Sequence, residues 1–151
     1  MKRLSMLLLM LLLALVLVGC GSPAGELDIN DVWGRTSPAA AENGAFYMTI
    51  TNNLGEDEQL LGASSAACGM TELHEMYMKE QDVMGMRPVE GGVIPIPAGE
   101  TVTLKVGGLH VMCMGKTQEF NPGDEIPITL TFAVSGTREV MAEIRDVSGD
   151  Q

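Results

Sequence analysis

The sequence predicts an all-β fold, an antiparallel β-sandwich with very little helix. Apolar residues occur in short runs, often alternating with polar ones, and no long stretch has the 3.6-residue spacing of an amphipathic helix. Clusters of Gly, Asn, Pro and Asp separate the runs, and many short strands at such spacing are typical of sandwiches and barrels. We expect strands at residues 27–35, 45–51, 59–64, 71–78, 83–87, 92–96, 101–106, 110–114, 126–134 and 139–146.

The alternation is clearest in the ninth of these segments. One of its two faces carries five apolar side chains, those of Ile126, Ile128, Leu130, Phe132 and Val134. Such a strand lays one face on a core and turns the other towards solvent. Pro127 has no backbone N–H, so we expect it at the beginning of its strand or at a sheet edge.

Length and charge limit the classes of function. The chain has 151 residues, which fits one domain, and a formal net charge of −11, which argues against a nucleic-acid partner. It contains only two histidines, and no nucleophile–base pair can be argued from them, so we do not expect an enzyme.

The N-terminus has the pattern of a lipoprotein signal peptide. Lys2 and Arg3 precede an apolar stretch at residues 6–18 that is shorter than the ~20 residues of a membrane span. The stretch ends in Leu-Val-Gly-Cys at Cys20, which resembles the lipobox of bacterial lipoproteins. We expect a signal peptide at 1–19, lipidation of Cys20, a tether at 20–26, an extracytoplasmic domain at 27–151 and attachment to a membrane.

Methionines cluster around the two histidines. Seven of the nine methionines outside the signal segment lie between residues 70 and 114. Because alternate residues of a strand share a face, Met76 and Met78 lie on the face of His74, and Met112 and Met114 on that of His110. Val111 and Cys113 then point the other way, towards the core. Two imidazoles and several thioethers would converge if these strands were neighbours.

The donor chemistry selects Cu(I). Thioether sulfur is a soft, neutral ligand that Cu(I) accepts together with imidazole, whereas Zn²⁺, Mg²⁺ and Ca²⁺ prefer other donors. Outside the cytoplasm, paired thiols tend to form disulfides, but thioethers stay available. Because imidazole must be deprotonated to bind, copper affinity should weaken as the pH falls through the histidine range.

The region from Leu73 to Gly115 resembles the PCu(A)C copper chaperone family, whose motif is His-x10-Met-x21-His-x-Met. Three stretches carry the likeness: Met-Gly-Met-Arg-Pro-Val at 84–89, Ile-Pro-Ala-Gly at 96–99 and Gly-Gly-Leu-His-Val-Met at 107–112. Val32-Trp33 and residues 45–47 and 50–52 resemble the family more weakly. The spacing here is longer, with eleven residues between His74 and Met86 and twenty-three between Met86 and His110.

The resemblance implies a cupredoxin-like Greek-key sandwich with Cu(I) bound by His74, Met86, His110 and Met112. The longer spacing leaves Met84 and Met76 as alternatives for the first methionine, with Met114 as a further candidate ligand. The resemblance also implies delivery of copper to a cuproprotein such as cytochrome c oxidase, alongside a thioredoxin-like copper chaperone.

Other interpretations stay open. Cys68 and Cys113 can form a disulfide or remain as two buried thiols, because the sequence does not give their Cα separation. A blue-copper site would need a second histidine close to Cys113, and none follows it. The main rival function is an envelope-anchored interaction module in which the methionines only pack.

Overall fold

The computed structural model describes residues 25–79 and 83–146, so Cys20 and the predicted signal peptide lie outside the described residues. Within them the chain forms ten strands and one short 3₁₀ turn, η3 (Glu90–Gly92). The strands are β1 (Leu27–Arg35), β2 (Gly44–Asn52), β3 (Glu58–Ser64), β4 (Cys68–Met78), β5 (Met84–Pro88), β6 (Ile94–Ile96), β7 (Thr101–Leu104), β8 (His110–Lys116), β9 (Glu125–Phe132) and β10 (Thr137–Arg145). The all-β prediction is confirmed, and each of the ten expected segments contains a strand.

The alternation predicted for the ninth segment holds within β9. Its four inward side chains, Ile126, Ile128, Leu130 and Phe132, all belong to the buried core. The prediction was wrong for Val134, which is exposed, because the strand ends at Phe132 and Ser135 already belongs to the turn into β10. Pro127 lies near the beginning of β9, as expected.

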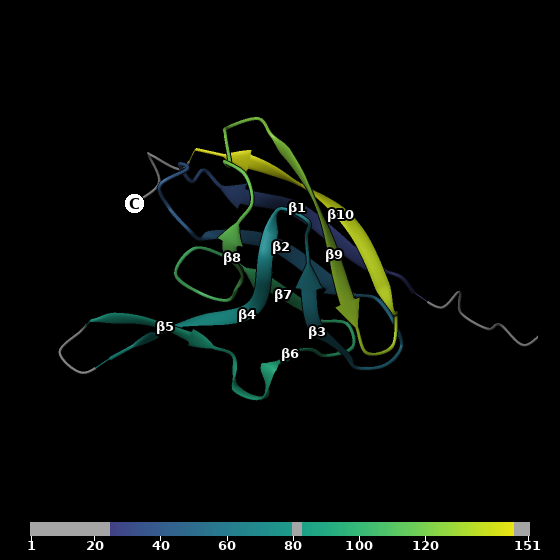
Figure 1. Ribbon diagram of the computed structural model, residues 1–151. Helices are drawn as coiled ribbons and strands as arrows, with labels where there is room; N and C mark the ends of the chain where they lie inside the picture. Colours follow the sequence, from purple (N-terminus) through teal and green to yellow (C-terminus); the bar gives the residue numbers. More distant parts are fainter. Residues whose placement is uncertain (1–24, 80–82, 147–151) are drawn as a thin grey trace, which may run out of the picture.

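The strands form one continuous hydrogen-bonded path that folds over into two layers around the core (Figure 1). Its order is β5-β4-β8-β2-β1-β10-β9-β3-β6, and β7 pairs with the second half of β2. Although β3 and β4 are not neighbours along this path, they approach each other, and the Thr71 hydroxyl donates a hydrogen bond to the Ala63 carbonyl. The curled sheet thereby encloses its apolar face.

One strand pair departs from the antiparallel prediction. β1 pairs with β10 in parallel, with Trp33 opposite Glu143 and Arg35 opposite Arg145. This pair joins the first strand of the domain to the last, so no hairpin forces it to be antiparallel. It joins the β5-β4-β8-β2-β1 part of the path to the β10-β9-β3-β6 part.

The β4–β5 hairpin extends beyond the body of the sandwich (Figure 1). Five cross-strand pairs hold it, from His74 opposite Pro88 to Met78 opposite Met84. Towards its other end β4 pairs with β8, and there the structure joins Cys68 to Cys113 through a disulfide with a Cα–Cα distance of 5.4 Å. The arrangement places β4 between β5 and β8, with both histidines at its centre.

Candidate metal centre

The register of β5, β4 and β8 gathers seven methionines and both histidines on one face. Residues directly opposite each other in an antiparallel pair point to the same side. His74 lies opposite His110 across β4 and β8, and opposite Pro88 across β4 and β5. The methionine pairs on this face are Met70–Met114 across β4 and β8, and Met76–Met86 and Met78–Met84 across β4 and β5, while Met112 lies opposite Glu72. We call this surface the methionine face.

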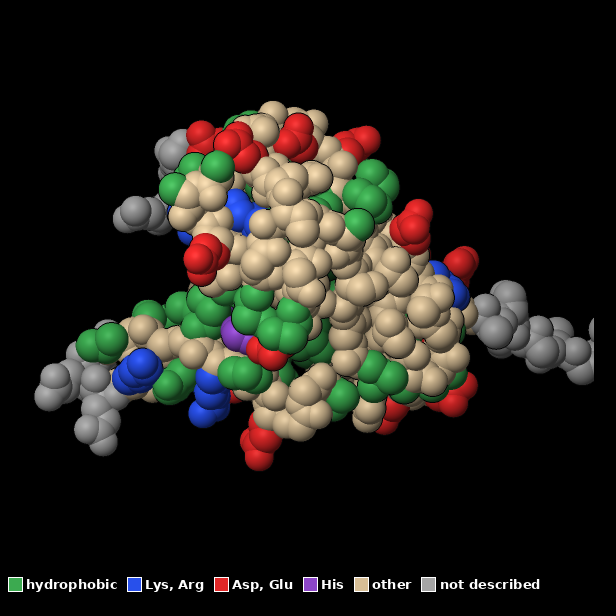
Figure 2. Space-filling model, in the orientation of Figure 1, with side chains coloured by type: hydrophobic (Ala, Val, Ile, Leu, Met, Phe, Trp, Pro, Cys, Tyr) green, Lys and Arg blue, Asp and Glu red, His purple; other side chains and the backbone are tan. Residues whose placement is uncertain are grey.

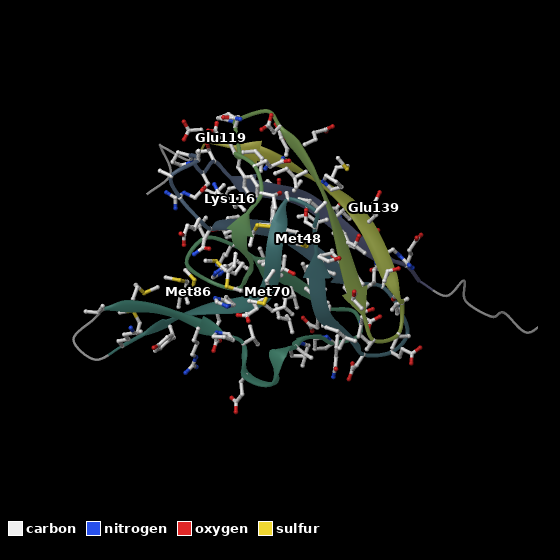
Figure 3. All side chains as sticks on the ribbon, in the orientation of Figure 1. Met48, Met70, Met86, Lys116, Glu119 and Glu139 are labelled. Atoms are coloured by element: carbon white, nitrogen blue, oxygen red, sulfur yellow. A yellow bond between two sulfur atoms is a disulfide. The ribbon has the colours of Figure 1, made fainter. Side chains whose placement is uncertain are left out.

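The opposite face of β8 belongs to the core, as predicted. Val111 and Cys113 are fully buried in the apolar cluster. Met48 also belongs to that cluster and lies within the body of the sandwich, whereas Met86 projects from the hairpin (Figure 3). Core packing therefore accounts for Met48 but not for the methionine face.

The two imidazole rings form the centre of this face. Their centroids are 5.9 Å apart and the rings meet edge to face. His110 is 3% exposed and His74 9% exposed. Figure 2 shows a small area of histidine surface bordered by hydrophobic side chains and an acidic group. The rings thus lie together in a largely water-excluded position that a ligand can still reach.

Each ring uses one nitrogen in a hydrogen bond and leaves the other without a partner. Nδ1 of His110 donates to the carbonyl of Gly108 at 3.0 Å, and Nε2 of His74 lies 2.9 Å from Oε2 of Glu72. The remaining nitrogens, Nε2 of His110 and Nδ1 of His74, are buried and have no hydrogen-bond partner. Buried polar atoms are rarely left unpaired, so this pair requires an explanation.

Burial lowers the pKa of His110 below the 6.5 of a free imidazole; the bond to Gly108 opposes this shift and the charge of His74 adds to it. Burial therefore favours the neutral form of His110. In that form Nδ1 holds the proton that bonds to the Gly108 carbonyl, and Nε2 presents a lone pair. Glu72 accepts a hydrogen bond from Nε2 of His74, which leaves Nδ1 as the nitrogen of that ring that could bind a metal. A metal ligand needs a neutral imidazole whose second nitrogen is held in this way.

Glu72 was missed in the sequence analysis, although the signal was there. It lies two residues before His74 in β4, so strand alternation places both side chains on one face. A carboxylate or carbonyl that accepts the second N–H of a ligating imidazole fixes its tautomer and orientation. Glu72 is positioned to accept such an N–H from His74, and the Gly108 carbonyl to accept one from His110.

Aromatic rings flank the histidine pair on the side of β2. Tyr47 lies 6.2 Å from the His110 ring, and Trp33 lies 4.5 Å from Tyr47, both between ring centroids. Tyr47 is buried, and burial raises its pKa while the charge of Arg35 lowers it to a smaller extent. This neighbour shields His110 from water and offers it no carboxylate or amine.

Donors of the usual zinc sites are scarce. Within residues 25–79 and 83–146, His, Cys, Asp and Glu side chains form no group of three or more that could hold a metal. The disulfide also removes the thiols of Cys68 and Cys113 as ligands. Any ion bound between the two free imidazole nitrogens would take its further ligands from thioethers, with Met112 and Met86 on the same face.

A separate hollow of about 630 Å³ lies at the end of β8, between the loop at 39–42 and residues 115–119. Lys116 and Glu119, labelled in Figure 3, line it. The Lys116 ammonium donates to the Ser37 carbonyl at 2.8 Å, to the Ser37 hydroxyl at 2.7 Å and to the Pro38 carbonyl at 3.1 Å. Its role is to fasten this loop to β8.

Solved structures of copper-binding domains share the fold. The copper-bound PCuAC domain from PmoF2 superposes with a TM-score of 0.65 at 20% identity, over 82% of this chain and 95% of that domain; this likeness concerns the fold. The solution structure of CuI-DR1885 from Deinococcus radiodurans gives a TM-score of 0.66 at 26% identity, over 88% of this chain and 87% of that protein. The predicted resemblance to PCu(A)C domains is confirmed.

Curated relatives agree with the lipoprotein pattern. The "Putative lipoprotein Lxx21020" of Leifsonia xyli subsp. xyli is 29% identical over 129 residues, which are 85% of this chain and 75% of the relative. The "Uncharacterized protein RP573" of Rickettsia prowazekii is 32% identical over 90 residues, which are 60% of this chain and 49% of that protein. No helix in the described part of the chain has the length and apolar content of a membrane span. Residues 27–144 match the family described as "Putative lipoprotein LpqE-like", and the chain therefore belongs to the LpqE-like family.

Proposed function

We propose that this protein is an extracytoplasmic Cu(I) metallochaperone that holds one copper ion on the methionine face and passes it to a cuproprotein. One observation carries the proposal: two buried imidazole nitrogens without hydrogen-bond partners lie on facing strands among thioethers. Copper in solved neighbours such as CuI-DR1885 supports the choice of metal.

The proposed ligands are Nδ1 of His74, Nε2 of His110 and the sulfurs of Met86 and Met112. All four are neutral, so the site gains nothing from a second positive charge on the metal and favours Cu(I) over Cu(II). The flexible methionine side chains can close around an ion between the strands. Glu72 and the Gly108 carbonyl would hold the imidazoles in place during loading and release.

Transfer follows from the unequal exposure of these ligands. The two imidazoles are buried, while Met86 is exposed on β5. A recipient can therefore replace the outer thioether first, and the buried nitrogens release the ion last. The resemblance to PCu(A)C proteins points to the copper site of cytochrome c oxidase as recipient and to a thioredoxin-like copper chaperone as a second partner.

The N-terminal pattern and the LpqE-like match support a lipid anchor at Cys20. Acyl chains contribute about 0.8 kcal/mol for each buried CH₂, so two of them keep the protein on the outer face of a membrane. Anchoring there would place the copper site beside membrane-embedded recipients. The protein then acts by binding and transfer rather than by catalysis.

Copper titration decides between this function and an interaction module that binds no metal. We expect the wild type to take up Cu(I) tightly in competition with a chromogenic chelator, and a variant with His110→Ala and Met112→Ala to lose affinity by at least about tenfold, because two of four ligands are gone. Met141→Leu, which changes an exposed methionine on β10, is the matched control. Equal, weak uptake by all three proteins would contradict the proposed function.

A further inference from the structure

The β4–β5 hairpin has two faces of different chemistry. On one of them the side chains are already paired with each other. The guanidinium of Arg87 lies 4.6 Å above the ring of Tyr77, and its Nε donates to Glu75 at 2.8 Å. Gly85 permits this packing, since a Cβ at that position would lie 2.9 Å from a Tyr77 ring atom. The stacked ring and the ion pair stabilise the hairpin and leave its opposite face free for another role.

The opposite face carries four thioethers in two directly opposed pairs, Met76–Met86 and Met78–Met84. Met78 is 56% exposed and Met84 is 48% exposed. Methionine usually fills irregular gaps in a core, but these residues belong to a hairpin that extends outside the body of the sandwich (Figure 1). Packing within the chain therefore does not explain why this face is made of methionine.

The hairpin geometry brings three of these sulfurs within reach of one ion. The backbone N–H of Lys79 donates to the Val83 carbonyl at 2.7 Å. Because hydrogen-bonded and non-hydrogen-bonded pairs alternate, the next pair, Met78–Met84, is non-hydrogen-bonded, the type in which Cα atoms are only ~4.5 Å apart. Met76 follows on the same face of β4, about 7 Å along the strand. Three rotatable methionine side chains can close that gap around a metal.

We propose that Met76, Met78 and Met84 form a second metal site, selective for soft monovalent ions such as Cu(I) or Ag(I) and weaker than the histidine site. Its thioethers carry no charge and bring no nitrogen or oxygen donor, so Zn²⁺ and other harder ions gain little there. The inference rests on the proposed function only for the identity of the physiological ion.

The hairpin site lies next to the histidine site along the same face. Met86 stands opposite Met76 and two residues from Pro88, which is opposite His74. An ion on the hairpin can pass inwards by ligand exchange, in which a copper–sulfur bond to Met84 breaks as one to Met86 forms. The copper stays cuprous throughout, so no electron donor or acceptor is required. In this way the exposed hairpin site supplies ions to the buried histidine site.

The test follows the methionine methyl groups and the imidazoles by NMR while Ag(I), the redox-inert analogue, is added to the full chain in detergent. We expect the imidazole signals to shift with the first equivalent and the methyl signals of Met76, Met78 and Met84 with the second. Signals of Met48 in the core and Met141 on β10 should stay in place and serve as internal controls. Zn²⁺ should leave the hairpin methyl signals unchanged.

A triple variant, Met76→Leu, Met78→Leu and Met84→Leu, keeps the apolar surface and removes the sulfurs. Bound Cu(I) should fall from about two equivalents to about one, with the tighter one retained, because only the thioether site is lost. Met141→Leu should keep both. Loss of the tighter equivalent in the triple variant, or no hairpin shift at any metal ratio, would overturn the second site. Hairpin shifts without imidazole shifts would instead overturn the proposed histidine ligands and leave this inference standing.

Discussion

Oε2 of Glu72 lies 2.9 Å from Nε2 of His74, and this contact leaves Nδ1 as the only ring nitrogen of His74 that can bind a metal. We predict that Glu72→Ala weakens Cu(I) binding by about 10–100-fold, the usual loss when a residue that orients a ligating histidine is removed. Chelator competition measures this. Glu72→Gln should recover part of the affinity, since its amide oxygen still accepts the His74 proton.

Glu75→Gln is the matched control for this substitution. Glu75 belongs to the same strand but lies on its other face, where it pairs with Arg87. It should leave copper affinity unchanged. If both substitutions weaken binding equally, general charge rather than orientation of His74 is responsible, and the role given to Glu72 is wrong.

The register favours Met86 over Met84 as the first methionine ligand. Met86 is two residues from the position opposite His74, and Met84 is four residues away. We predict that Met86→Leu lowers the affinity of the tight Cu(I) site by at least about tenfold, as expected for a lost ligand, while Met84→Leu leaves that site unchanged. Both substitutions keep an apolar side chain of similar size, so binding constants of the two variants are directly comparable. If Met84→Leu lowered the affinity and Met86→Leu did not, Met84 would be the ligand.

The strands of this fold are predictable from the sequence because their information is local. The alternation in β9 and the turn residues between strands depend only on neighbouring positions in the chain. These local patterns predicted the bounds of all ten strands to within a few residues. The sequence predicts that His74 and His110 converge only if their strands are neighbours. The pairing of β4 with β8 depends on contacts between residues far apart in sequence, which no local pattern encodes.

Two features, the parallel strand pair and the Glu72–His74 contact, escaped prediction, and the disulfide was left open. The parallel pair of β1 and β10 joins the two ends of the domain, so no turn specifies its direction. The Cys68–Cys113 disulfide depends on a Cα separation that only the β4–β8 register sets. The Glu72–His74 contact, by contrast, was within reach of strand alternation, but Glu72 is a common surface residue type and does not stand out beside methionines.

The Cys68–Cys113 disulfide links positions 45 residues apart and ties β4 to β8 towards the end of β4 that lies away from the β4–β5 hairpin. Closing a loop of this length restricts the unfolded chain, and we predict that Cys68→Ala with Cys113→Ala lowers the free energy of unfolding by about 2–4 kcal/mol. Urea denaturation measures the loss. The reduced wild type keeps both sulfur atoms in the core, so a similar loss there assigns the effect to the covalent link, and an unchanged stability would contradict it.

Glu58 is 1% exposed, and its carboxylate contributes a pH-dependent part of the stability. Burial alone would raise its pKa, but hydrogen bonds from the Gln59, Val134 and Ser135 N–H groups and the Ser135 hydroxyl outweigh burial and lower the pKa from 4.5 to about 2. The folded state therefore binds the proton less readily than the unfolded state. Its contribution is fully present above pH 4.5 and is lost as the pH falls to about 2.

This shift corresponds to about 3 kcal/mol at neutral pH. We predict that Glu58→Gln lowers the free energy of unfolding by up to that amount at pH 7, and that the difference from the wild type shrinks steadily between pH 4.5 and 2. Urea denaturation at a series of pH values measures both effects. Glu56→Gln, an exposed neighbour, is the control and should keep the wild-type profile. A difference between Glu58→Gln and wild type that stays constant down to pH 2 would show that lost packing, and not the charged hydrogen bonds, is the cause.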